Sequence, residues 1–214
     1  MSHSSAYRDG LRFFGRVSAS VSHEIKNVFA VINEAAGLIG DFTLMAEKGM
    51  PIQPERLKKA ADSIQGQVRR GDAIVRNMNA FAHSIDEDIR EVDLAELAGL
   101  TVALATRMAD MKQVRLTLGD CAAVVLSATP FDLMRLLHES IAVVLDAMQP
   151  GDSLAVGVKS APDGASFTLG AGGKAVPAVE GKELVDMAEA MGLAVEIGEL
   201  DGALAISIRA PQAG

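Results

Sequence analysis

The sequence predicts an α+β protein in which a long antiparallel helical hairpin precedes a smaller α/β domain. Two observations carry this prediction. Apolar side chains recur at three- and four-residue spacing over residues 5–48 and again over residues 54–85, which is the period of a helix. Beyond residue 92, helical stretches alternate with strand-like stretches. The 214 residues suffice for two domains, which we place at residues 1–88 and 89–214.

The first helical stretch contains no proline, and its apolar residues fall close to one a/d line of a heptad repeat. Its glycines weaken an isolated helix, so packing must hold it. Pro51 and Pro54 end the pattern, and Pro54 opens the second stretch with Glu55 in its first turn. The expected line consists of Phe14, Val17, Val21, Val28, Val31, Ala35, Leu38, Phe42 and Met45.

The second helical stretch has an apolar line of its own. A single hairpin cannot bury two lines of this length, because each helix keeps apolar surface on both flanks of the shared seam. Two hairpins packed as a four-helix bundle can bury it, so we expect a homodimer. The second line consists of Leu57, Ala61, Ile64, Val68, either Ile74 or Val75, Met78 and Phe81.

The second domain follows a charged joint at residues 86–91. We expect a helix that opens with Thr129 as its cap and Pro130 at its first position. Helices mixed with antiparallel hairpins are typical of an α+β domain. The expected helices cover residues 94–111, 129–148 and 182–191, the expected strands cover residues 114–118, 124–126, 153–160, 166–169, 193–197 and 203–209, and the expected turns lie at residues 162–164 and 201–202.

Composition excludes several classes of protein. A net charge of −8 argues against nucleic-acid binding. Cys121 is the only cysteine, so no intrachain disulfide forms, and its small apolar neighbours suggest a buried residue rather than a reactive thiol. The N-terminus lacks the apolar run of a signal peptide, and no stretch approaches about 18 consecutive apolar residues. We therefore expect a cytoplasmic protein without a membrane span.

One polar cluster in the first helical stretch points to chemistry. His23 is flanked by Glu24, Lys26 and Asn27. A neutral imidazole that donates one N–H to a carboxylate offers its other nitrogen as a nucleophile. Glu24 is a candidate for that carboxylate, and Lys26 for a cation that screens an incoming phosphoryl group. Each residue turns a helix by about 100°, which places His23 well off the line through Val21 and Val28. Its ring should therefore face solvent.

Four segments together resemble the core of a two-component histidine kinase. Ser-His-Glu-Ile-Lys-Asn at residues 22–27 resembles the histidine box of the dimerisation and phosphotransfer domain. Val-Asp-Leu-Ala-Glu-Leu at residues 92–97 resembles the start of the ATP-binding domain. Residues 132–148 resemble the helix that carries the asparagine box, and Arg-Ala-Pro at residues 209–211 resembles the end of that domain. The resemblance implies that His23 is the phosphoacceptor, that Glu24 polarises it and that Asn27 orients water when kinases act as phosphatases.

The nucleotide boxes of that family do not carry over. Glu139 and Val143 stand where the resemblance places the asparagine pair, and valine has no atom that holds Mg²⁺. Residues 168–173 contain glycines but lack the aspartate that contacts adenine in the family, and about eight residues before the next helix leave no room for an ATP lid. We therefore expect no cofactor in this chain, and Mg²⁺ only on a partner.

What remains resembles the dimeric histidine phosphotransferases that are built from degenerate kinase parts. The resemblance implies relay of phosphoryl groups between the receiver domains of response regulators, and a hybrid histidine kinase is a further candidate partner. Ala30, Val31 and Glu34 would border a docked receiver. The alternatives are a divergent kinase that still uses ATP, and a binding module that sequesters a receiver or kinase without phosphotransfer.

Several of these residues also have simpler explanations. Lys26, Asn27 and Glu34 would need no chemistry if they merely faced water. His83 lies near the end of the second helical stretch, where a cation suits the helix dipole. His138 lies next to Glu139, but no second pair of metal ligands at a suitable spacing accompanies them.

Overall fold

The computed structural model describes residues 3–86, 89–161, 164–172 and 181–209, with side chains from residue 7 onward. The chain divides into two compact units. Arg16–Asn79 form one unit, and Met1–Gly15 together with Ala80–Gly214 form the other. The described parts are α+β, with helices first and a mixed sheet after them, as the sequence predicts.

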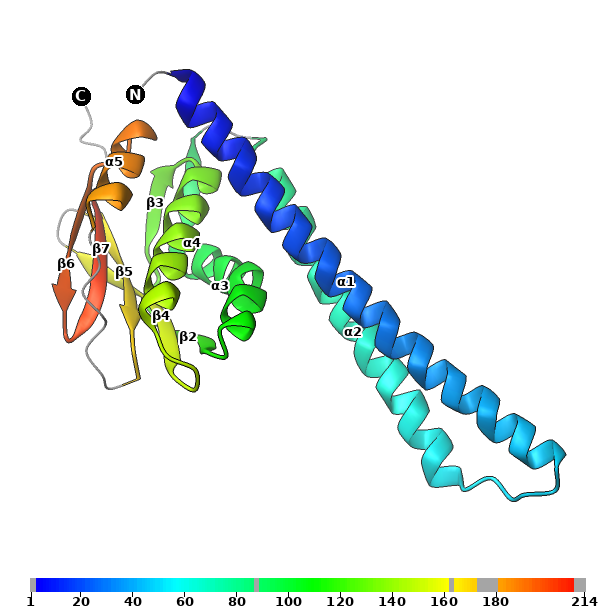
Figure 1. Cartoon of the computed structure of the whole chain (residues 1–214). Helices are drawn as coiled ribbons and strands as arrows, with labels where there is room; N and C mark the ends of the chain where they lie inside the picture. Colours follow the sequence, from blue (N-terminus) through cyan, green and yellow to red (C-terminus); the bar gives the residue numbers. More distant parts are fainter. Residues whose placement is uncertain (1–2, 87–88, 162–163, 173–180, 210–214) are drawn as a thin grey trace. The chain divides into compact units, whose positions relative to one another are not determined.

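The hairpin consists of α1 (His3–Glu47) and α2 (Pro54–His83), which run side by side in opposite directions (Figure 1). Both helices lie within about two residues of their predicted bounds. Gly71 on α2 faces Val28 on α1, since a Cβ added at Gly71 would lie 3.5 Å from Cγ1 of Val28, an ordinary van der Waals contact. Val28, Ala35 and Phe42 are buried at heptad spacing and form the centre of the seam.

The seam within one chain is narrower than the sequence predicts. Leu38 and Met45, predicted as members of the line, are exposed, and Val31 is only half-buried. At the N-terminal end the buried residue is Phe13, whereas the predicted Phe14 is half-buried. One partner helix covers a single row of side chains, so the adjacent rows of the apolar stripe are left outside.

One part of α1 passes a simple test for membrane spans. Among the described residues, Tyr7–Glu47 is long and apolar enough to cross a membrane by length and composition, and most of its most apolar window is not buried. The segment has no long uninterrupted run of apolar residues, because charges such as Glu34 and Asp41 divide it. Its mean hydropathy is nevertheless high. Helices of soluble proteins pass the same test.

The C-terminal part of the second unit is built on a mixed five-stranded sheet. β2 lies parallel to β4, and all other neighbours in the sheet are antiparallel. Each of these strands overlaps a predicted one. In spatial order the strands are β2 (Arg115–Cys121), β4 (Ser153–Ala161), β5 (Gly164–Gly170), β7 (Ala203–Arg209) and β6 (Val195–Leu200).

Three helices contact this sheet. They are α3 (Leu94–Met111), α4 (Pro130–Ala147) and α5 (Lys182–Ala190). Alternate strand residues such as Leu154, Phe167 and Ile206 are fully buried and form the core with the helices. The side chain of Asp93 caps α3 by accepting hydrogen bonds from the backbone N–H groups of Ala95 and Glu96, at 2.8 and 3.1 Å.

A second, two-stranded sheet lies where the sequence analysis placed a charged joint and an apolar run. β1 (Arg90–Asp93) pairs antiparallel with β3 (Val125–Ala128), with Val92 opposite Leu126. Strand β1 was not predicted from the sequence, because its single buried residue, Val92, stands among charged residues and gives no alternating apolar pattern. The turn predicted at residues 201–202 is confirmed, since Asp201 and Gly202 both have positive φ, as a type I′ turn requires. Of the turn predicted at residues 162–164, residues 162–163 lie outside the described part.

An aromatic cluster explains why the first helical turns belong to the C-terminal unit. Phe13 meets Phe81 edge-on at 5.5 Å between ring centroids and lies 5.4 Å from the ring of Phe131. Phe14 stacks on Phe81 at 5.2 Å, and the His138 ring lies 5.2 Å from that of Phe13. These contacts join the start of α1 and the end of α2 to α4.

We expect Phe13→Ala to destabilise the C-terminal unit by about 3 kcal/mol, because it removes a ring that is 1% exposed at the centre of this cluster. Urea unfolding monitored by circular dichroism measures the loss. The matched control is Tyr7→Ala, since Tyr7 on the same helix is 70% exposed. Equal stability of the two variants would show that the cluster does not hold the helix start to this unit.

Candidate functional site

His23 lies in the middle of α1, inside the hairpin unit, and its side chain is exposed as predicted. At 100° per residue it lies about 140° from Val28, the centre of the seam. The preceding residue, Ser22, donates its hydroxyl hydrogen bond to the backbone carbonyl of Ser18 at 2.9 Å and so does not compete for the imidazole. The ring is therefore open to a reactant from solvent.

Glu24 faces the other helix of the hairpin. Its carboxylate oxygen Oε2 lies 3.7 Å from a terminal nitrogen of Arg70 on α2, and its side chain is 14% exposed. About 100° of rotation separates it from His23, its neighbour in sequence. The acid predicted to polarise His23 is thus also half of an ion pair across the hairpin.

The other predicted residues occupy the same side of α1 as His23. Asn27 lies about 40° from His23 around the helix, and Lys26 about 60° away in the other direction. Both side chains are exposed. Ala30 and Glu34 are exposed and lie about 20° from His23, whereas Val31 is half-buried and turned toward the seam. These residues form one accessible strip.

Sequence reasoning missed Arg70. The only signal that would have found it is the register of the two helices, which the approach of Gly71 to Val28 sets. Arg70 lies about 100° from Gly71, and His23 about 140° from Val28, in the same rotational sense. In an antiparallel pair, equal rotational sense places two residues on the same side of the hairpin. The structure therefore brings a cation to the side that carries His23.

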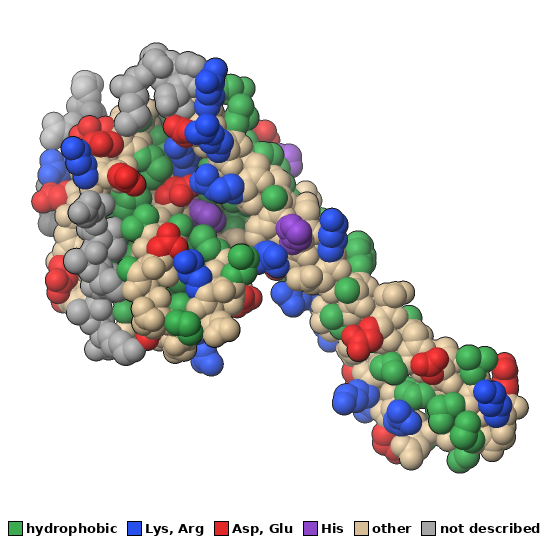
Figure 2. Space-filling model, in the orientation of Figure 1, with side chains coloured by type: hydrophobic (Ala, Val, Ile, Leu, Met, Phe, Trp, Pro, Cys, Tyr) green, Lys and Arg blue, Asp and Glu red, His purple; other side chains and the backbone are tan. Residues whose placement is uncertain are grey.

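The opposite side of the hairpin carries exposed apolar side chains beside the seam. Measured around each helix from the seam, five apolar residues lie about 40–100° away in the rotational sense opposite to that of His23 and Arg70. They are Ile25, Phe29 and Ile32 on α1, and Val68 and Val75 on α2. Phe29 is 63% exposed, and Val68 and Val75 are each 49% exposed. In the single view of Figure 2, hydrophobic side chains at the hairpin surface gather mainly toward the turn between α1 and α2. We call these five residues the apolar flank.

The positions that the family resemblance aligns with its nucleotide boxes lie on α4 and around the end of β5. Glu139 and Val143 are half-buried on α4. Gly172 has φ +51°, and a Cβ there would collide with the Ser153 hydroxyl, so this glycine serves the backbone of the loop. Gly173 lies outside the described residues. Across the described ranges, no group of three or more His, Cys, Asp or Glu side chains is arranged to hold a metal.

The surroundings of Cys121 and Asp132 in the C-terminal unit raise the pKa of each group. Burial raises the pKa of the Cys121 thiol, which disfavours the thiolate, in keeping with the expectation of an unreactive cysteine. Burial also raises the pKa of Asp132 in the first turn of α4, although the charge of Arg135 opposes the shift. Neither group lies on the hairpin.

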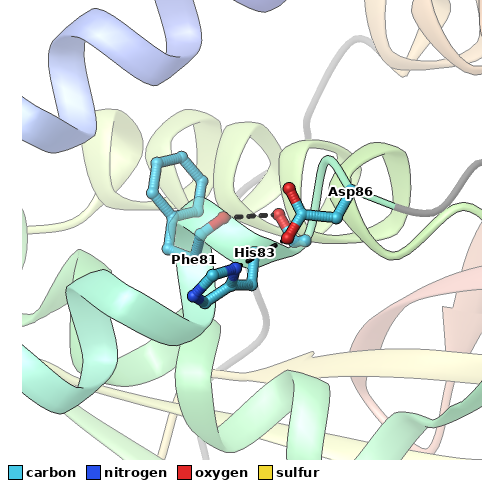
Figure 3. A network of polar contacts seen from close by, with 4 residues as sticks. Phe81, His83 and Asp86 are labelled. Carbon is cyan, nitrogen blue, oxygen red and sulfur yellow. Dashed lines mark hydrogen bonds and ion pairs between the residues drawn. The ribbon is translucent and has the colours of Figure 1, made fainter.

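His83 has a specific partner near the end of α2. Its Nδ1 lies 2.6 Å from Oδ2 of Asp86, and Figure 3 shows the two side chains pointing toward one another. The Ser84 hydroxyl donates to the backbone carbonyl of Phe81 at 2.6 Å, which satisfies an acceptor in the last helical turn. His83 therefore has a side-chain partner just beyond the helix, and its capping role stays a prediction.

The sequence matches no protein-family model and no curated protein. Among solved structures, a bacterial phosphotransferase is 18% identical, with 92% of this chain and 95% of that chain covered and a TM-score of 0.48. The ATP-binding domain of PrrB from Mycobacterium tuberculosis is 18% identical, with 59% of this chain and 100% of that chain covered and a TM-score of 0.45.

A third similar structure is the histidine kinase ThkA in complex with the response regulator protein TrrA. It is 16% identical, with 96% of this chain and 64% of that chain covered and a TM-score of 0.45. Histidine kinase domains are thus among the structures to which this chain is similar. Because the identities are low and the TM-scores lie below 0.5, the functional argument rests on the residues of this chain.

Proposed function

We propose that this protein is a histidine phosphotransferase that relays phosphoryl groups between receiver domains of response regulators through His23. The observation that carries the proposal is the exposed His23 imidazole, presented in mid-helix with Glu24 beside it and Asn27 one turn away. Glu24 orients the ring, and Lys26 and Asn27 shape the field around the transferred group.

The chemistry needs only a receiver that carries an aspartyl phosphate. The unprotonated ring nitrogen of His23 attacks phosphorus, so that an N–P bond forms while the bond from phosphorus to the acyl oxygen breaks. The receiver carboxylate leaves with the electron pair, and the other ring nitrogen keeps its proton. Attack by a carboxylate of a second receiver reverses the step. Mg²⁺ belongs to the receiver in this scheme.

The C-terminal unit supports a role without ATP. Phosphoryl transfer from ATP depends on a metal and on positioned phosphates. Val143 offers no ligand atom at the position where the family resemblance requires one, and Gly172 serves the local backbone. In the proposal, this unit braces the hairpin or helps to dock the receiver.

The apolar flank supports the homodimer. Side chains such as Phe29, Val68 and Val75 expose apolar area that a second hairpin would cover in a four-helix bundle. The strip of Ala30, Val31 and Glu34 lies on the other side of α1, next to His23, and is proposed to contact the receiver. A dimer through the apolar flank leaves that strip open. We place the protein in the cytoplasm, and its single cysteine, which forms no intrachain disulfide, supports this proposal.

When the protein is mixed with a receiver carrying labelled aspartyl phosphate, we expect the label to move to His23. His23→Ala should abolish this transfer and leave the helix content unchanged, because the side chain is exposed. Acid-labile, base-stable label located by peptide mapping is the measurement. A His23→Ala variant that kept full effect on its receiver would instead favour a binding module without phosphotransfer.

With labelled ATP and Mg²⁺ as the sole phosphate source, we expect no label on His23, because the positions of the family's metal-binding asparagines hold Glu139 and Val143. A phosphorylated receiver in a parallel reaction is the positive control. Self-labelling from ATP would contradict the proposal and identify the protein as a divergent histidine kinase.

Phe29→Glu combined with Val68→Glu should weaken the dimer at least about 100-fold, because two charges would be buried in the proposed bundle interface. Analytical ultracentrifugation over a range of concentrations gives the dissociation constant. Met111→Glu is the control, because Met111 is an apolar residue on α3 that is 73% exposed. An unchanged dimer in the double variant would rule out the apolar flank as the interface.

A further inference from the structure

We propose that Arg70 binds the phosphoryl group while His23 carries it. This inference rests on the proposed function and adds to it a residue from the second helix of the hairpin. The starting observation is the ion pair of Arg70 with Glu24, the residue that follows His23 in the chain. That pair brings a guanidinium to the turn of α1 from which the imidazole projects.

The placement of Arg70 distinguishes it from the other arginines of α2. Arg69 and Arg76 lie about 140–160° from Gly71 in the opposite sense and so point away from His23. Arg56 lies near the far end of the hairpin, where its guanidinium is 4.5 Å from the centre of the Phe42 ring. Arg70 alone among these four lies on the His23 side and at the turn that holds Glu24.

The ion pair is loose enough to exchange. Its 3.7 Å separation exceeds a charge-assisted hydrogen bond, and the Arg70 side chain is 53% exposed. Ion pairs of solvent-exposed side chains contribute little to stability, so little is lost when the guanidinium turns toward another anion. Glu24, at 14% exposure, is the more fixed partner and keeps the guanidinium nearby.

Phosphorylation supplies a stronger anion at the same place. A phosphoryl group carries a charge of about −1.5 to −2 at neutral pH and three acceptor oxygens, which a planar guanidinium can bind through two parallel hydrogen bonds. The Glu24 carboxylate would otherwise repel that group. A guanidinium between the two anions removes the repulsion and retains the phosphoryl group until a receiver carboxylate displaces it.

The test compares Arg70→Gln with Arg69→Gln, a matched control one residue away on the opposite side. Phosphoramidate, a small phosphodonor, phosphorylates histidine without a partner protein. We expect R70Q to be labelled about tenfold more slowly than wild type, which corresponds to one lost charge-assisted contact, and R69Q to match wild type.

A second readout separates contact with the phosphoryl group from a structural role. In a ³¹P NMR titration of the phosphorylated protein, R70Q should raise the midpoint of the last phosphoryl ionisation by roughly 0.3–1 pH unit, because a neighbouring cation favours the dianion. R70K should fall between wild type and R70Q, and it replaces R70Q if circular dichroism shows that the glutamine variant has lost helix.

The outcomes distinguish this inference from the function on which it rests. No label on wild-type His23 from phosphoramidate or from a phosphorylated receiver would overturn the proposed function itself. Normal labelling of the wild type, with R70Q equal to R69Q in rate and titration, would overturn only the role of Arg70. A slower R70Q with an unshifted ³¹P titration would also overturn it, because that result indicates an effect on the helix pair alone.

Discussion

The packing of α1 against α2 along Val28 and Gly71 is the constraint on which the candidate site depends. Gly71 and Val28 face one another across the helix pair, and their contact marks the register of the two helices. That register turns His23 to solvent and brings Arg70 from α2 to Glu24 on α1. It also gathers the apolar flank on the other side of the hairpin, so the proposed chemistry and the proposed self-association use different sides of one helix pair.

The C-terminal unit is a well-packed α/β structure. Its buried strand and helix side chains form the core of its described part. The aromatic cluster around Phe13 and Phe81 makes the open end of the hairpin part of this unit. In the proposed function this unit needs no metal-binding side chains, and Val143 on α4 has no ligand atom.

Helix and strand positions were largely predictable because they depend on local patterns. Apolar spacing, the prolines before α2 and the Thr129-Pro130 start of α4 place most elements within a few residues. The failures share a cause. Strand β1 contains one buried residue among charged ones. Its partner strand, β3, is distant in the sequence, with Val92 opposite Leu126. The choice of Phe13 over Phe14 as the buried ring likewise depends on distant partners, namely Phe81 and Phe131.

The sequence by itself determined the helical hairpin, the α+β character of the second domain and the exposure of His23, because each follows from the spacing of apolar residues along one segment. Only the tertiary structure decided which acid and which base meet beside that histidine. A pair such as Glu24 and Arg70 is set by the relative rotation and register of two helices. Those quantities come from side chains packing across the interface, and no local pattern within either helix contains them.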